Sequence, residues 1–195
     1  MNWITKFIKP KIKSLFKKRV ENNREELWTT CGCKNLVYKE DLQSNFYCCP
    51  KCGAHHKLSC IERFKLFFDN QEFETIETPV PNDDPLNFFD KKKYTDRLKQ
   101  ARNITKQDDA VAIAKGKIQD IEVTVGAQDF RFIGGSFGAA SGEAFISGVQ
   151  HALENKTPFI FFSCSGGQRM MESSIALMQM SRTTIAVNEL KKNNL

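Results

Sequence analysis

Residues 159–173, with the sequence FIFFSCSGGQRMMES, change from an apolar run to a glycine pair and then to helix-forming residues. The short aromatic run is bounded by Pro158 and by Gly166 and Gly167, which favours a fully buried strand over a helix. Residues 169–190 then have helical spacing. We therefore expect a strand, a tight glycine turn and a helix N-terminus, where free backbone N–H groups can hold an anion or a developing oxyanion. A simple turn between strand and helix explains these residues equally well.

The composition is that of a globular protein. The chain has 195 residues, 41% of them hydrophobic and 27% charged, and is long enough for one or two domains with a real core. No run approaches the roughly 18 apolar residues of a membrane helix, and the N-terminus lacks the pattern of a signal peptide. These features predict a cytoplasmic protein without a membrane span.

Basic charge is concentrated at the N-terminus. The first 24 residues carry eight Lys or Arg against the single acidic residue Glu21, which leaves the remainder of the chain near neutral. Apolar residues at near-helical spacing alternate with the lysines, and Pro10 interrupts the pattern. This basic amphipathic arm, residues 1–26, either contacts nucleic acid or an anionic membrane, or packs its apolar side on protein with its lysines in water. We favour the second interpretation.

Six of the seven cysteines lie in the first third of the chain, which favours a metal site over disulfides. Cys31 and Cys33 are followed, after fifteen residues, by Cys49 and Cys52. This is a zinc-ribbon spacing, in which four thiolates converge on one zinc ion at ~2.3 Å. The first pair has one intervening residue where two are usual, and Gly32 is the residue best able to allow the tighter turn.

The other cysteines and nearby histidines are weaker candidates. Cys48, His55 and His56 are close enough in sequence to be ligands, but the four cysteines already complete a closed structural site. We expect Cys60 and Cys164 to be small buried residues of the core.

The rest of the chain alternates strands and helices. Residues 59–106 contain a short amphipathic helix, a turn rich in proline and aspartate, and a helix over about 86–102, which indicates a helical linker. Residues 107–195 begin with a β-hairpin that turns at Gln119 and Asp120, followed by strand, glycine loop, helix and strand. Helices between the strands of a mixed sheet predict an α/β layer architecture.

The glycine loop of residues 134–144, GGSFGAASGEA, is not a nucleotide-binding motif. Its glycines fit neither the Walker spacing nor the dinucleotide fingerprint, so locally it reads as a turn before a helix over 141–155. The serines around Gly166 form no Gly-x-Ser-x-Gly elbow, and no His or Asp suggests a catalytic triad. A serine hydrolase is therefore not expected.

Five segments together resemble the β subunit of bacterial acetyl-CoA carboxylase carboxyltransferase. They are WTTC…C, NFYCCPKCGAHHKL, DDAVAIAKGKI, FIGGSFGAASGEAF and SCSGGQRMMESSIALMQMSRTT, in that order and at the right separations. The resemblance runs from about Leu27 to the last residue. It implies a zinc ribbon over 27–58 in front of a crotonase-like α/β carboxyltransferase domain over 107–195. The family continues beyond the position of Leu195, so we expect this domain to be incomplete at its C-terminus.

The resemblance also implies an activity and partners. The family transfers a carboxyl group from carboxybiotin on a carrier protein to acetyl-CoA, giving malonyl-CoA in the first committed step of fatty acid biosynthesis. It implies one structural zinc per subunit, an α subunit in an α₂β₂ assembly, a biotin carboxyl carrier protein and biotin carboxylase. By the same resemblance, Gly166 and Gly167 supply an oxyanion hole, and Gly134 and Gly135 shape the CoA-binding wall. Arg169 is either a ligand for a CoA phosphate or a structural or interface salt bridge.

This chemistry explains an active site without an obvious histidine or carboxylate. The acetyl-CoA enolate and the ureido oxygen of biotin both carry negative charge, and backbone N–H donors can hold both. A side-chain base is dispensable if biotin itself takes the methyl proton. The alternative function is a zinc-ribbon nucleic-acid-binding protein that uses the basic arm. The second half of the chain lacks interleaved basic and aromatic residues, although weak nucleic-acid binding beside enzymatic activity stays open.

Overall fold

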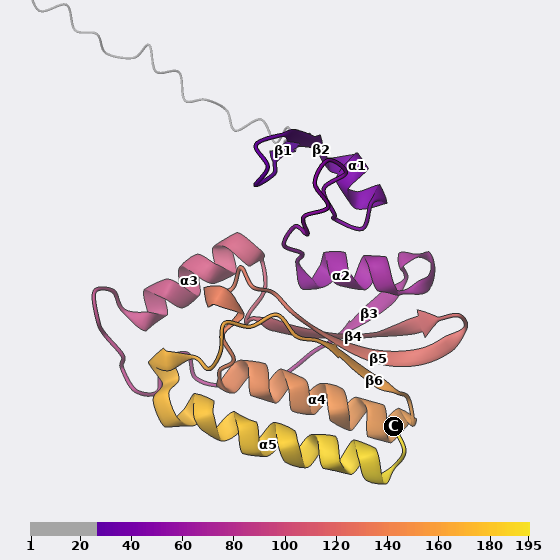
Figure 1. Cartoon of the computed structure of the whole chain (residues 1–195). Helices are drawn as coiled ribbons and strands as arrows, with labels where there is room; N and C mark the ends of the chain where they lie inside the picture. Colours follow the sequence, from indigo (N-terminus) through magenta and orange to yellow (C-terminus); the bar gives the residue numbers. More distant parts are fainter. Residues whose placement is uncertain (1–26) are drawn as a thin grey trace, which may run out of the picture.

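The computed structural model describes residues 27–195, which form a small N-terminal ribbon and a larger α/β domain (Figure 1). The predicted basic arm lies outside the described residues. In the ribbon, strand β1 (Trp28–Thr30) pairs antiparallel with β2 (Leu36–Tyr38), and the short helix α1 (Lys39–Ser44) follows. No helix among the described residues is both long and apolar enough to cross a bilayer.

The larger domain contains a four-stranded mixed sheet in the order β3-β4-β5-β6. Its strands are β3 (Phe73–Ile76), β4 (Val111–Ile118), β5 (Ile121–Gln128) and β6 (Phe159–Phe162). The first three are antiparallel, and β6 runs parallel to β5. Gln119 and Asp120 connect β4 to β5 with φ of 49° and 65°, the backbone of a tight hairpin turn. The predicted hairpin is therefore confirmed.

Helices cover both faces of the sheet (Figure 1). Helix α2 (Cys60–Phe67) lies on one face, and α4 (Ala139–Asn155) lies on the other with α5 (Ser173–Lys192) packed against it. Because β5 and β6 are parallel, the chain must cross over between them, and α4 forms this crossover. The predicted α/β layer architecture is confirmed.

Two hydrophobic layers hold the helices to the sheet. Helix α2 begins with a capping box between Ser59 and Glu62, and its side chain Phe64 is completely buried. Phe64 packs with Phe68 against the valines and alanine of β5. On the opposite face, Phe145 of α4 meets the aromatic side chains of β6, including an edge-to-face contact with Phe161 at 5.0 Å between ring centroids.

The interpretation of residues 59–106 as a helical linker is wrong. Their first half supplies α2 and β3, which belong to the α/β domain. The predicted helix over 86–102 is α3, which begins only at Tyr94 (Tyr94–Thr105). The preceding segment is held in turns, because Asp84 accepts the Phe88 N–H at 2.9 Å and Asp90 accepts the Lys92 N–H at 3.0 Å.

The segment after β6 also differs from the prediction. Helix α5 begins at Ser173, and Met170–Glu172 form a separate 3₁₀ turn before it. Gln168 forms an extended bridge with Phe137, which keeps the chain out of the helical conformation at this point. Strand β6 is half-buried and not fully buried, because its only neighbour among the described strands is β5.

Candidate active site and metal centre

The four predicted cysteine ligands converge in the ribbon. The sulfur atoms of Cys31, Cys33, Cys49 and Cys52 all lie within 4.8 Å of one another. Cys31 Sγ is 3.6 Å from Cys52 Sγ, and Cys33 Sγ is 3.9 Å from Cys49 Sγ. Four sulfurs bound tetrahedrally at ~2.3 Å from zinc stand about 3.8 Å apart, so the arrangement fits a zinc ion.

Left-handed residues shape the two cysteine knuckles. Lys34 has a φ of 66° in the first knuckle, and Gly53 has a φ of 71° in the second. Gly32 has no positive φ, and a Cβ added to it would meet no atom within 4 Å. The expectation that Gly32 permits the shortened first knuckle is therefore wrong, because Lys34 makes the turn instead.

Asn35 prepares one thiol for metal binding. Its backbone N–H and its side-chain amide both donate to Cys33 Sγ, and these hydrogen bonds lower the pKa of that thiol to about 6. The side-chain bond measures 3.4 Å. Hydrogen bonds to sulfur favour the thiolate, which is the form that binds metal.

The remaining cysteines lie outside the cluster. Cys48 Sγ is 3.1 Å from His55 Nδ1, and neither these residues nor His56 belong to the set of four converging ligands. Cys60 is buried as predicted, and burial raises the pKa of its thiol to about 12. Cys164 is exposed, contrary to the prediction, because it lies on the loop that follows the half-buried strand β6.

The two glycine pairs pack against each other. The Gly166 N–H donates to the Gly134 carbonyl oxygen at 2.9 Å, and the Cα of Gly135 lies against the Cys164 carbonyl. Gly134 and Gly135 have φ of 66° and 62°, a backbone conformation that favours glycine at both positions. A Cβ on Gly135 would also overlap the Cys164 carbonyl oxygen. One loop therefore supports the other.

The N–H groups of the second pair have partners within the chain. Gly166 donates to Gly134, and Gly167 donates to Ser165 Oγ at 3.0 Å. The pair also stands apart from the N-terminus of α5, since the Met170–Glu172 turn lies between them. Of the two donors, that of Gly167 is the easier to free, because the serine hydroxyl that accepts it belongs to an exposed side chain.

A cavity of about 480 Å³ opens beside Gly167, between β6 and α5. Phe161, Met180 and Val187 give it apolar walls, and its polar lining residues include Ser165 and Thr183. An apolar cleft with a few polar groups is the usual form of a small-molecule site.

Arg169 is buried in an ion network. Its side chain is 1% exposed, and hydrogen bonds engage the Nε and both Nη nitrogens. The acceptors are the carboxylates of Asp109 and Glu172, the Tyr94 hydroxyl, and the hydroxyl and carbonyl oxygens of Ser136. Burial alone would lower the pKa of Arg169, but the hydrogen bonds and charge of Asp109 raise it. This geometry supports the structural salt bridge and leaves no donor for a CoA phosphate.

Glu172 occupies the N-terminus of α4. Its Oε2 accepts the Ala139 N–H at 2.6 Å, and its Oε1 accepts the Tyr94 hydroxyl at 2.5 Å. A Cβ on Gly138 would stand 2.7 Å from both carboxylate oxygens, which explains the glycine at this position. The positive end of α4 is thus neutralised by an internal carboxylate. The sequence analysis missed Glu172, Tyr94 and Asp109. The only local signal was Glu172, a charged residue that directly follows two methionines.

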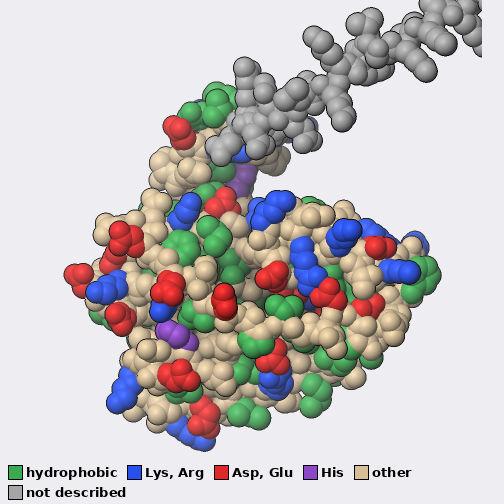
Figure 2. All heavy atoms as spheres, turned by 180° about the vertical axis from the view of Figure 1, so that it is seen from behind, with side chains coloured by type: hydrophobic (Ala, Val, Ile, Leu, Met, Phe, Trp, Pro, Cys, Tyr) green, Lys and Arg blue, Asp and Glu red, His purple; other side chains and the backbone are tan. Residues whose placement is uncertain are grey.

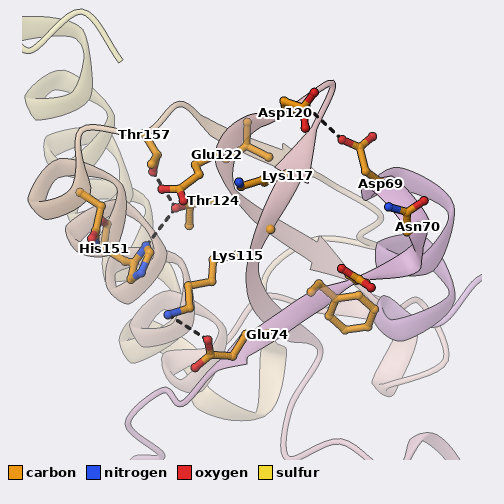
Figure 3. Close-up of a pocket in the computed structure, with 15 residues that line it drawn as sticks. Asp69, Asn70, Glu74, Lys115, Lys117, Asp120, Glu122, Thr124, His151 and Thr157 are labelled. Carbon is orange, nitrogen blue, oxygen red and sulfur yellow. Dashed lines mark hydrogen bonds and ion pairs between the residues drawn. The ribbon is translucent and has the colours of Figure 1, made fainter.

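A second cavity, of about 570 Å³, lies at the hairpin end of the sheet, away from the glycine loops (Figure 3). Lys115 Nζ pairs there with Glu74 Oε2 at 3.0 Å. Thr124 Oγ1 lies 3.0 Å from His151 Nδ1 and 2.9 Å from Thr157 Oγ1. No residue that the sequence predicted for the site lines this cavity.

Comparison with known families identifies the two parts of the chain. Residues 28–52 match the acetyl-CoA carboxylase zinc finger domain, and residues 63–194 match the carboxyl transferase domain. The chain belongs to the carboxyl transferase domain family. The predicted order of a zinc ribbon followed by an α/β carboxyltransferase domain is therefore confirmed.

Two curated relatives of this carboxyl transferase chain are both named acetyl-coenzyme A carboxylase carboxyl transferase subunit beta. The protein of Pelagibacter ubique is 48% identical over 199 residues, covering 100% of this chain and 64% of the relative. That of Xanthobacter autotrophicus is 43% identical over 193 residues, covering 98% and 64%. The chain thus spans about 64% of the length of these relatives.

Two solved structures share the fold of this chain. The transcarboxylase 12S core matches with a TM-score of 0.54 and 23% identity, over 77% of this chain and 25% of that one. A Pseudomonas malonate decarboxylase hetero-tetramer matches with a TM-score of 0.51 and 20% identity, over 70% and 48%. At these identities the likeness extends to the fold alone.

Proposed function

We propose that this chain is the carboxyltransferase β subunit of an acetyl-CoA carboxylase, which helps to transfer the carboxyl group of carboxybiotin to acetyl-CoA. One observation carries the proposal: the four-cysteine ribbon and two mutually packed glycine loops beside an apolar cavity occur together in one chain. The identity of 48% to a protein of that name supports it.

In this proposal the chain holds the thioester and stabilises its negative charge. The cavity between β6 and α5 accepts the apolar part of the substrate, and Gly134 and Gly135 form the adjoining wall. Gly167 supplies an oxyanion donor once the hydroxyl of Ser165 turns away from its N–H. Gly166 acts indirectly, because its own N–H holds the first loop in place.

Zinc has a structural role in the proposal. Cys31, Cys33, Cys49 and Cys52 would bind one ion and hold together a ribbon whose own core is small, with Val37 and Leu42 as its other buried hydrophobic residues. Reduced thiols are the ligands, which agrees with a cytoplasmic location. Carboxybiotin on a carrier protein would be the carboxyl donor, and biotin carboxylase would supply it.

The proposed partners include an α subunit in an α₂β₂ assembly. The nucleic-acid-binding alternative is not favoured, because the relatives are named as carboxyl transferase subunits and most of the chain matches the carboxyl transferase domain. On the face seen in Figure 2, the described residues carry interspersed acidic and basic side chains. That arrangement lacks the single basic surface that tracks a phosphate backbone.

Co-expression with an α subunit tests the function. The purified complex should transfer a carboxyl group between malonyl-CoA and a soluble biotin derivative, and the rate should depend on both subunits. A complete β subunit of a relative, assembled with the same α subunit, is the positive control. Activity in the control but none in the complex of this chain would contradict the proposal.

A further inference from the structure

The ion network around Arg169 connects the two glycine loops. The Arg169 Nη2 donates to the Ser136 carbonyl at 2.7 Å, and its Nε donates to the Ser136 hydroxyl at 3.2 Å. Ser136 directly follows the first glycine pair, and Arg169 lies two residues after the second. The backbones are joined as well, because the Phe137 N–H donates to the Gly167 carbonyl and the Arg169 N–H donates to the Phe137 carbonyl, both at 2.9 Å.

The same guanidinium is anchored to the sheet and to α3. Asp109, which precedes β4, accepts hydrogen bonds from Arg169 Nη2 at 2.8 Å and from Arg169 Nη1 at 2.5 Å. Ser141 of α4 donates its hydroxyl to Asp109 at 2.6 Å, and Tyr94 of α3 lies 3.2 Å from Arg169 Nη1. The loops are thus fixed to α3, to the start of β4 and to α4, and of these only α4 reaches the cavity beside Gly167, through Phe145.

The buried charges of the network compensate one another. Two buried carboxylates, of Asp109 and Glu172, face one guanidinium, and the excess negative charge is met by the Ala139 N–H at the start of α4. Removal of one partner from a buried ion pair strongly destabilises the fold. The side chains of Arg169, Asp109 and Glu172 therefore hold one another in a single geometry. A lysine at position 169 would supply the charge but not the planar set of five donors.

We propose that Arg169 and Glu172 are positioning residues, which lock the loop of Gly134 and Gly135 against the loop of Gly166 and Gly167. The network sets the direction of the backbone donors at the cavity, although neither side chain touches the substrate. The effect of the network on catalysis, the catalytic part of this inference, rests on the proposed function. The locking of the two loops, the structural part, does not.

Amide hydrogen exchange tests the structural part. In the zinc-loaded chain, Arg169→Lys should accelerate exchange of the Gly166 amide by about tenfold or more relative to the Val125 amide in the centre of β5. Arg182→Lys is the matched control, because Arg182 pairs with Glu143 at 2.6 Å between α4 and α5, away from the glycine loops. It should leave the ratio of the two exchange rates unchanged.

A purely structural ion pair gives a different result. In that case Arg169→Lys would accelerate exchange at Gly166 and Val125 by the same factor, and the proposal would be overturned. If Arg169→Lys fails to fold, the isosteric Glu172→Gln replaces it, since the glutamine oxygen can still accept the Ala139 N–H. Selective acceleration at Gly166 is again the expected outcome, and uniform acceleration the contradictory one.

Kinetics of the assembled carboxyltransferase test the catalytic part. Arg169→Lys should lower kcat by about tenfold or more while the KM for malonyl-CoA changes little, because donors aimed at the transition state are displaced. A fall in apparent kcat that equals the loss of folded complex, measured on the same sample by thermal unfolding, would overturn this part, because an unfolded fraction lowers kcat at an unchanged KM. An inactive complex with the unaltered chain would contradict the proposed function instead, and the exchange result would stand on its own.

Discussion

The backbone N–H of Gly166 donates to the carbonyl oxygen of Gly134 at 2.9 Å, which joins two loops from distant parts of the sequence. The side chain of Gln128, at the end of β5, also links the two loops. It donates to the Gly135 carbonyl at 2.6 Å and accepts the Cys164 N–H at 3.2 Å. The two loops therefore support each other at the carboxyl ends of the parallel strands β5 and β6, and a change in either affects both.

Gly135→Ala should destabilise the fold more than Gly134→Ala. Both positions have positive φ, which costs a residue with a Cβ about 1–2 kcal/mol. Only at Gly135 does the added Cβ also overlap the Cys164 carbonyl, whereas the space at Gly134 is open. Urea denaturation of the two variants measures the difference. Equal losses of unfolding free energy would contradict the packing of the loops described here.

Zinc content should depend on the four predicted thiols and not on the glycine at position 32 between Cys31 and Cys33. Cys49→Ser removes one ligand, so the purified protein should hold much less than one zinc per chain. Gly32→Ala is the control, and it should bind zinc normally because the added methyl meets no atom within 4 Å. Metal analysis decides, and equal zinc in Cys49→Ser and the unaltered protein would exclude the assignment.

Removing zinc should unfold the ribbon while the α/β domain persists. The pairing of β1 with β2 depends on the cysteine knuckles, whereas the sheet has its own core around Phe64 and Val125. A strong chelator is therefore expected to abolish the ribbon amide signals in an NMR spectrum and leave those of β5 in place. Simultaneous loss of both sets would show that the two parts fold as one unit.

Local pattern predicted the features that depend on neighbours in sequence. The hairpin turn at Gln119 and Asp120 and the four-cysteine cluster both follow from short-range spacing. The start of α5 did not, because the bridge between Gln168 and Phe137 is a contact across the fold. The same holds for most partners of Arg169, since Asp109, Tyr94 and Ser136 come from distant segments and only Glu172 is near in sequence. Burial of a charged side chain is decided by tertiary packing, and a single sequence carries no periodic signal for it.

The exposed face of α5 should cause self-association of the chain on its own. Leu177, Met178, Met180 and Ile185 are each more than half exposed, which is unusual for large apolar side chains along one helix. Light scattering at rising concentration should show oligomers or aggregates, and Leu177→Lys combined with Ile185→Lys should reduce them. A monomer with a sharp, cooperative thermal transition and no concentration dependence would contradict this expectation.

Gly167 should be needed for catalysis more than for stability. Its φ is 123°, and a Cβ at this position meets no atom within 4 Å, so a larger side chain strains the backbone without a clash. In the assembled enzyme, Gly167→Val should displace the donor beside the cavity and lower carboxyl transfer by ~10² to 10³. Ser165→Ala is the matched variant. It removes the hydroxyl that occupies the Gly167 N–H, so the donor is already free and transfer should be retained.

Paired measurements of carboxyl transfer and thermal unfolding separate the two roles of Gly167. The strained backbone should lower the Tm of Gly167→Val, so transfer is measured well below that Tm, and loss of transfer by protein that is still folded supports an oxyanion donor. A lower Tm with full transfer at temperatures below the transition would make Gly167 a turn residue only. Ser165→Ala gives a second check, because a large loss of transfer in that variant would mean that the hydroxyl itself contacts the substrate. The cavity beside Gly167 would then present a side-chain donor in place of the backbone N–H.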